Sequence, residues 1–198
     1  MYAIIDIETT GLSPGSERIT EIAVIVHDGK KEVEKFSTLI NPERKISYRI
    51  TQITGINNKM VETAPKFYEV AKKIVEITEN KIVVGHNVRF DYGFLRAEFK
   101  SLGYDYKRQT LDTIKLSRKL ISGQPSYGLG KLCKALNIVN PDRHRAMGDA
   151  TATKSLFELL LSMDEHPEQI NLNGVQSDLS KSLVKDLPRE AGVYYFYD

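Results

Sequence analysis

Apolar and polar positions along this chain follow two periods, one typical of strands and one typical of helices. The first stretch, YAIIDIETTG at residues 2–11, is apolar and β-favouring until two acids appear two positions apart. Side chains alternate across a strand, so one face is expected to carry Tyr2, Ile4, Asp6 and Glu8, and the other Ala3, Ile5 and Ile7. Apolar residues on both faces indicate a strand buried on both sides, with the two acids at its end and little water nearby.

The same periods predict the remaining elements. Strands are expected at residues 19–26, 32–40, 82–84 and 110–112, and helices at 67–77, 89–102, 113–120, 129–136 and 145–163. The Asp28-Gly29 turn joins the second and third strands directly, which makes them antiparallel. Residues 47–58 are predicted to be irregular. This order is typical of an α/β fold with a mixed five-stranded sheet flanked by helices.

Two further acids lie on predicted helices. Asp91 shares a helix face with Phe94, Leu95 and Leu102, so it is expected to point toward the protein body. Asp149 lies among small residues of the last helix, which allow another backbone to approach closely. A carboxylate in such a place is unfavourable unless it binds something.

The histidines and the cysteine differ in what their positions predict. His144 lies five positions before Asp149, at the entry to the last helix. His27 beside the hairpin turn and His166 in a polar stretch are predicted to be exposed and inert. Cys133 falls on the apolar stripe of its helix and is predicted to be a core residue.

Composition narrows the class of protein. The chain has 198 residues, of which 41% are hydrophobic, enough for one packed domain or a domain plus a fragment. We expect no membrane association, because no apolar run is long enough to span a bilayer and Asp6 interrupts the N-terminal one. The single cysteine excludes an internal disulfide and is typical of a cytoplasmic protein. The net charge of +2 does not by itself indicate nucleic acid.

The composition changes after the last predicted helix. We predict a domain over residues 1–164 and a polar linker over 165–185, where Asn, Gln, Ser, Asp and Lys dominate. Hydrophobicity returns in LPREAGVYYFYD, so residues 186–198 are interpreted as the incomplete start of a second domain. The alternative is an edge strand that returns to the main sheet.

Four acids and one histidine together indicate a metal-dependent hydrolase. Asp6, Glu8, Asp91 and Asp149 offer hard oxygen ligands, which favour Mg²⁺ or Mn²⁺ over zinc. Four carboxylates can hold two such ions roughly 4 Å apart, the arrangement that clamps both oxygens of a phosphoryl displacement. Histidine titrates near ~6.5, so His144 fits a general base. Taken alone, His144 would be interpreted as a surface histidine that caps a helix.

Three motifs carry a resemblance to a known family. DIETTG, HNVRFDYGFL and HRAMGDA resemble the three motifs of DEDD exonucleases of the histidine subtype, and the proofreading subunit of bacterial DNA polymerase III is a similar member. The resemblance implies a ribonuclease H-like fold, two divalent ions and 3′→5′ hydrolysis that releases nucleoside monophosphates. It assigns Asp6, Glu8, Asp91 and Asp149 to the metals and His144 to the base. It assigns the terminal nucleotide to Thr9, Thr10, Gly11, Leu12, Thr54, His86, Asn87 and Phe90.

The expected partner is the 3′ end of a single DNA strand, in proofreading or repair. A basic set is expected to follow its phosphates: Arg89, Lys115, Arg118, Lys119, Arg143 and Arg145. The tail resembles the first strand of GIY-YIG endonuclease domains. Residues Gln169 to Leu172 resemble part of the motif that binds sliding clamps, so a polymerase or a clamp is a further expected partner. Two alternatives remain: an RNA exonuclease, and a non-catalytic nucleic-acid-binding module with a structural metal site.

Overall fold

The computed structural model describes residues 1–140 and 142–163, so the predicted linker and the GIY-YIG-like tail lie outside the described residues. The strands are β1 (Tyr2–Thr9), β2 (Ile19–His27), β3 (Glu32–Leu39), β4 (Ile82–Gly85) and β5 (Thr110–Asp112). The helices are α1 (Tyr48–Thr54), α2 (Asn58–Val61), α3 (Phe67–Thr78), α4 (Val88–Ser101), α5 (Thr113–Leu120), α6 (Leu129–Ala135) and α7 (Ala146–Met163). Among the described helices, none is both long enough and apolar enough to cross a membrane.

One mixed sheet runs through the centre of the molecule. Its five strands are ordered β3-β2-β1-β4-β5, with β1 in the middle. The β1–β2 and β2–β3 pairs are antiparallel, whereas β1–β4 and β4–β5 are parallel. The mixed five-stranded sheet predicted from the sequence is therefore confirmed.

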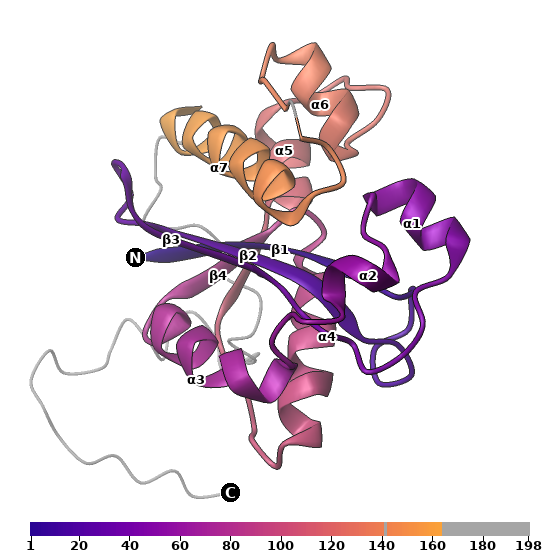
Figure 1. The fold of residues 1–198 in the computed structure, drawn as a ribbon. Coiled ribbons are helices and arrows are strands. Elements are labelled where there is room, and N and C mark those ends of the chain that lie inside the picture. Colours follow the sequence, from indigo (N-terminus) through magenta and orange to yellow (C-terminus); the bar gives the residue numbers. More distant parts are fainter. Residues whose placement is uncertain (141, 164–198) are drawn as a thin grey trace, which may run out of the picture.

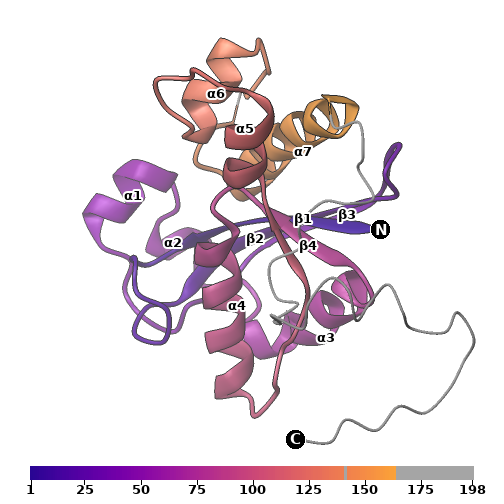
Figure 2. The ribbon, with the colours of Figure 1, turned by 180° about the vertical axis from the view of Figure 1, so that it is seen from behind.

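Helices cover both faces of the sheet and form two separate cores. Figure 1 and Figure 2 show α3 and α4 on one side and α5, α6 and α7 on the other. The alternation predicted for β1 is confirmed, because Ala3, Ile5 and Ile7 belong to the first core and Ile4 to the second. Each buried aliphatic side chain contributes roughly 1.5–3 kcal/mol, so the face to which each β1 residue points is strongly fixed. Asp6 and Glu8 share the face of Ile4, under α7.

The segment predicted to be irregular, residues 47–58, instead contains the whole of α1 and the first residue of α2. Ser47 caps α1 by accepting a hydrogen bond from the Ile50 amide, and Gly55 ends that helix with a φ of 72°. Asn57 caps α2 through the Met60 amide. Serine, asparagine and glycine are also turn residues, which is why the pattern was misinterpreted. Such short helices depend on the small apolar cluster beneath them, which is centred on Ile56.

The prediction that His27 is exposed was wrong. Its side chain is buried, and Nε2 lies 3.0 Å from Oε1 of Glu158 on α7. The Gly29 amide donates to its Nδ1 at 3.0 Å. A hairpin turn is normally exposed, but α7 packs across β2, and the sequence does not reveal that contact.

The end of α4 explains one further difference between the sequence prediction and the structure. Leu102 was predicted to join the buried face of α4, but α4 ends at Ser101 and Leu102 is 45% exposed. Gly103, with a φ of 76°, turns the chain away, as its position after the helix predicted. Cys133 is buried, as predicted.

The buried contact of His27 yields a stability prediction. His27→Ala removes the partner of Glu158 and of the Gly29 amide and leaves a cavity, so the free energy of unfolding should fall by about 2–4 kcal/mol. Urea denaturation measures the loss. His166→Ala, in the predicted linker, is the control and should change nothing. A His27→Ala variant as stable as the control would show that the contact under α7 does not form.

Candidate active site

Three carboxylates meet where β1 passes under the start of α7. Asp6 and Glu8 come from β1, and Asp149 comes from the first turn of α7. Each offers a carboxylate oxygen, and these oxygens all lie within 4.8 Å of one another. The structure therefore brings together three of the four acids singled out in the sequence.

Asp91 approaches the same strand from α4. The parallel neighbour of β1 pairs with it only as far as Ile4, so β1 continues beyond β4 with an open edge. There the backbone N–H of Ile7 donates to Oδ1 of Asp91 at 3.2 Å. Asp91 is buried, as predicted, and its charge acts on Asp6. It therefore lies beside the three-carboxylate group, held by the strand that carries two of its members.

Burial and mutual repulsion shift the titration of these acids. Burial, followed by the charges of Asp91 and Asp149, raises the pKa of Asp6 well above its usual range. Burial, then Asp149, raises the pKa of Glu8 to about 8. Burial raises the pKa of Asp91 to about 7. Ionised carboxylates this close need a cation, and a set made only of oxygen donors fits Mg²⁺ or Mn²⁺.

The loop before α7 is bonded directly to Asp149. Its Oδ1 accepts from Asn140 Nδ2 at 2.7 Å, and its Oδ2 accepts from the His144 backbone N–H at 2.9 Å. His144 has a φ of 64°, a left-handed conformation that few non-glycine residues adopt. Asp149 is thus oriented by the same short loop that presents His144.

His144 and two of the carboxylates, Asp6 and Asp149, share one hollow of about 320 Å³. It is lined by Asp6, His144 and Asp149, by His86 and Arg143, and by residues of the segment 126–131. His86 helps to hold the segment 126–131 in place, because its Nε2 lies 2.8 Å from the Tyr127 carbonyl oxygen. Burial lowers the pKa of His86, and a neutral ring with its proton on Nε2 satisfies that carbonyl.

The other nitrogen of His86 is also in contact with the protein. Its Nδ1 lies 2.9 Å from the Thr113 hydroxyl. Both ring nitrogens therefore have protein partners in this structure. The direct nucleotide contact expected for His86 stays a prediction.

The turn after β1 is bonded from within and leaves one side chain outside. The Thr9 hydroxyl donates to the Gly11 carbonyl, and the Thr10 hydroxyl donates to Glu17, each at 2.5 Å. A Cβ on Gly11 would lie 2.8 Å from the Glu17 side chain, so only glycine fits there without movement. Leu12, in contrast, is 82% exposed. The turn is a fixed support with an apolar side chain free to contact a ligand.

The three remaining predicted binding residues lie outside the hollow that contains Asp6 and Asp149. Thr54 is buried, and its hydroxyl donates to the Ile50 carbonyl in its own helix. Asn87 is exposed with a φ of 70°, and Phe90 packs partly into the core. Figure 1 and Figure 2 show α1, which ends at Thr54, at the end of the sheet toward which β1 runs.

Sequence reasoning missed Glu21 and Asn140. Glu21 is opposite Glu8 in the β1–β2 register and is buried. It pairs with Arg145, so that member of the basic set has a protein partner already. The available signal was an acid inside a strand whose other residues are almost all apolar. Asn140 gave no such signal, because its role depends on the fold of the loop.

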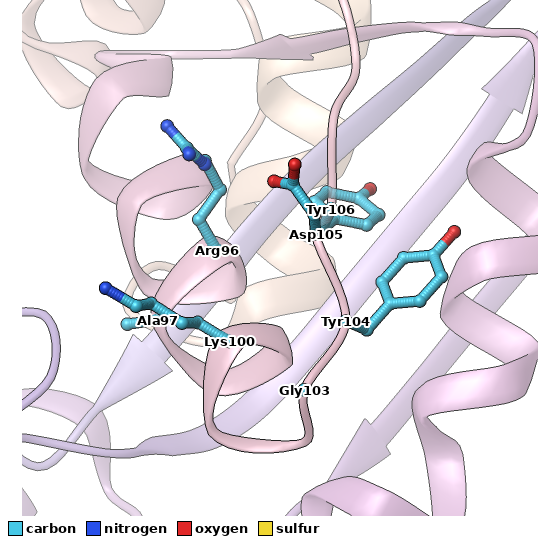
Figure 3. Close-up of a pocket in the computed structure, with 7 residues that line it drawn as sticks. All are labelled: Arg96, Ala97, Lys100, Gly103, Tyr104, Asp105 and Tyr106. Carbon is cyan, nitrogen blue, oxygen red and sulfur yellow. The ribbon is translucent and has the colours of Figure 1, made fainter.

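Another hollow of the described structure lies away from the carboxylates. It measures about 430 Å³ and lies between the end of α4, which carries Arg96 and Lys100, and the chain that follows it, which carries Asp105 (Figure 3). Asp91 occupies the first turn of α4, and Lys100 its last turn. This hollow is thus at the opposite end of the helix from the carboxylates, and we do not assign the chemistry to it.

The pKa shifts predict how stability depends on pH and metal. Without divalent ions, folded Glu8 keeps its proton up to about pH 8, whereas an unfolded glutamate loses it near pH 4.5. The free energy of unfolding should therefore decrease as pH rises through this window. Mg²⁺ should raise the melting temperature more at pH 8 than at pH 5, because it binds the ionised acids. Thermal melts with EDTA or Mg²⁺ test this, with Glu8→Gln as control, and an equal Mg²⁺ effect at both pH values would contradict it.

Comparison with known proteins places the chain in a family. The sequence profile of the Exonuclease family, RNase_T, matches residues 3–157. A PolC-type DNA polymerase III of Caldanaerobacter subterraneus subsp. tengcongensis is 36% identical over 184 residues, which are 93% of this chain and 13% of that protein. The 3'-5' exonuclease DinG of Bacillus subtilis is 36% identical over 169 residues, 84% of this chain and 18% of that protein. The chain thus spans less than a fifth of the length of these relatives.

Solved structures show the same fold. Exonuclease X in complex with 5′ overhanging duplex DNA has a TM-score of 0.70 and 30% identity, over 86% of this chain and 97% of that chain. The nuclease domain of 3′hExo, a DEDDh family member bound to rAMP, has a TM-score of 0.74 and 17% identity, over 87% and 95% of the two chains. The fold is ribonuclease H-like, as the motifs implied. With its profile match, its sheet and its carboxylate cluster, this chain belongs to the Exonuclease family.

Proposed function

We propose that this domain is a two-metal 3′→5′ exonuclease of the histidine subtype that removes nucleoside 5′-monophosphates from single-stranded DNA ends. One observation carries the proposal: Asp6, Glu8 and Asp149 present oxygens within 4.8 Å of one another, and His144 lines the hollow that Asp6 and Asp149 also line. A purely structural ion would need no proton acceptor beside it. The names of the relatives add support: one is a 3'-5' exonuclease, one is a PolC-type DNA polymerase III, and one is an exonuclease in complex with DNA.

The chain divides the chemistry between carboxylates and histidine. Asp6, Glu8 and Asp149, with Asp91 beside them, would hold two Mg²⁺ or Mn²⁺ ions. When bound, the ions supply charge stabilisation for the scissile phosphate and for the oxygens that attack and leave. His144 accepts the proton of the attacking water at one of its ring nitrogens. The hydrogen bond from its backbone to Asp149 keeps this base next to a metal ligand.

The terminal nucleotide is assigned to the turn after β1. Thr9, Thr10 and Gly11 form the fixed part of this turn, and the exposed Leu12 packs against the terminal nucleobase. Thr54 and Phe90 would line the far side of this nucleotide. Because Leu12 is largely exposed, its side chain would bury apolar area when a ligand binds.

The wider setting is proposed on weaker grounds. Similarity to PolC-type polymerases suggests proofreading, with a polymerase or sliding clamp as partner and a role in replication or repair. The cytoplasmic location rests on the single cysteine, Cys133. Each of these stays a prediction for the chain.

Polarity and product can be tested with labelled strands. A 5′-labelled single DNA strand with Mg²⁺ should shorten to a ladder and release 5′-monophosphates, because the site accepts a free end. A 3′-phosphate should block it, since it occupies the place of the terminal hydroxyl. Matched RNA should be cut more slowly. Cutting of a closed circular single strand would contradict an exonuclease, and faster cutting of RNA would contradict the choice of DNA.

The division of roles predicts different effects for two variants. Asp149→Asn removes a charged ligand, so Mg²⁺ affinity and activity should fall together. His144→Ala leaves all the carboxylates in place, so the Mg²⁺-induced melting shift should persist while the single-turnover rate falls roughly 10²–10⁴-fold. Both quantities are measured on both variants. A near-normal rate for His144→Ala would show that another group is the base, and loss of its melting shift would show that His144 supports the metals.

A further inference from the structure

Glu21 joins β2 to the start of α7 through three hydrogen bonds. Its Oε1 accepts from Arg145 Nη2 at 2.6 Å, and its Oε2 accepts from Arg145 Nε at 3.0 Å. The same Oε2 accepts from the backbone N–H of Ala146 at 3.0 Å. The guanidinium fork thus meets the carboxylate side-on, and the first amide of α7 is satisfied by the same group.

Glu21 is placed as a support for the site and not as a metal ligand. It is the residue opposite Glu8 in the register of β1 and β2. Both of its oxygens already accept hydrogen bonds from the protein. It is also absent from the group of oxygens within 4.8 Å that Asp6, Glu8 and Asp149 form in the described residues.

The bonds of Glu21 hold the residues that directly follow His144. His144 itself has a left-handed backbone, which a non-glycine residue keeps only when its neighbours are fixed. On its other side, the loop is held by Asn140, which donates to Asp149. The loop also lies against α7 so closely that a Cβ on Gly148 would be 2.1 Å from the Asp142 carbonyl oxygen. His144 is therefore the free side chain of a loop that is fixed on both sides.

We propose that Glu21 is a positioning residue for His144: through Arg145 and the Ala146 amide, it fixes the loop that presents the imidazole to the carboxylates. The proposal rests on the proposed role of His144 as general base. Glu21 contributes orientation and no proton transfer. Its charge matters because a fork of two hydrogen bonds to a carboxylate sets the direction of the Arg145 side chain, whereas a neutral amide accepts only part of that fork.

The chain contains a matched ion pair that, in the described residues, is not bonded to the loop of His144. Glu98 on α4 pairs with Arg18 at 2.7 Å. The arginine side chain is 42% exposed and the glutamate side chain 6% exposed, the same values as for Arg145 and Glu21. Glu98 also accepts a backbone N–H, that of Ile19. The two glutamates thus have the same kind of partners, but only Glu21 is joined to the loop of His144.

The experiment compares Glu21→Gln with Glu98→Gln in steady-state cleavage of a labelled DNA strand with Mg²⁺, over a range of strand concentrations and well below both melting temperatures. Both variants should lose similar stability. Glu21→Gln should lower kcat roughly 10- to 100-fold, the usual effect of removing a group that orients an active-site residue. Its KM and its Mg²⁺-induced melting shift should stay near wild type. Glu98→Gln should keep its kcat, and Arg145→Lys, which loses the fork, should behave like Glu21→Gln.

A double variant decides whether Glu21 acts through His144. If it does, His144→Ala with Glu21→Gln should cleave as slowly as His144→Ala alone. A further loss in the double variant would overturn the proposal, because Glu21 would then act through Glu8 or the metals. Equal kcat values for Glu21→Gln and Glu98→Gln would overturn it as well. A His144→Ala variant with the wild-type rate would instead contradict the proposed function, on which this inference rests.

Discussion

The repulsion among four carboxylates, one buried and three partly buried, is the constraint on which the rest of this structure depends. Asp6, Glu8 and Asp149 present oxygens within 4.8 Å of one another, and Asp91 is bonded to the strand between the first two. Burial raises the pKa values of three of them, so the unliganded cluster favours protons. The fold tolerates this arrangement because packed layers on both faces of the sheet hold β1 in place. The same repulsion favours a divalent cation between the carboxylates, because its positive charge offsets theirs.

Hydrogen bonds from the surrounding backbone and side chains orient two carboxylates of the cluster. β1 extends past β4, which leaves an amide for Asp91, and the loop before α7 satisfies both oxygens of Asp149. Glu21 fixes the other end of that loop. Asp91 and Asp149 are thus oriented by neutral amides, and the buried acid that is paired with a cation, Glu21, lies just outside the cluster. This separation leaves the negative charge of the cluster available to the ions.

Much of the fold was predictable because it depends on local pattern. The alternation in residues 2–8 gave both faces of β1, and the helical stripes located α3, α5, α6 and α7. The site acids were recognisable because charge inside an apolar pattern is rare. Contacts between distant segments were not predictable: Glu21 and Arg145 are 124 positions apart, and His27 is buried only because α7 crosses its strand. The short helix α1 was missed because its caps are also turn residues.

The most direct test of the account is to locate the ions. Crystals grown with Mn²⁺ and a nucleoside 5′-monophosphate would show each ion by its anomalous scattering. The account predicts two peaks roughly 4 Å apart, bounded by Asp6, Glu8, Asp91 and Asp149, with the phosphate of the nucleotide between them and the His144 ring. A single peak at this cluster, or peaks bound by other residues, would contradict it.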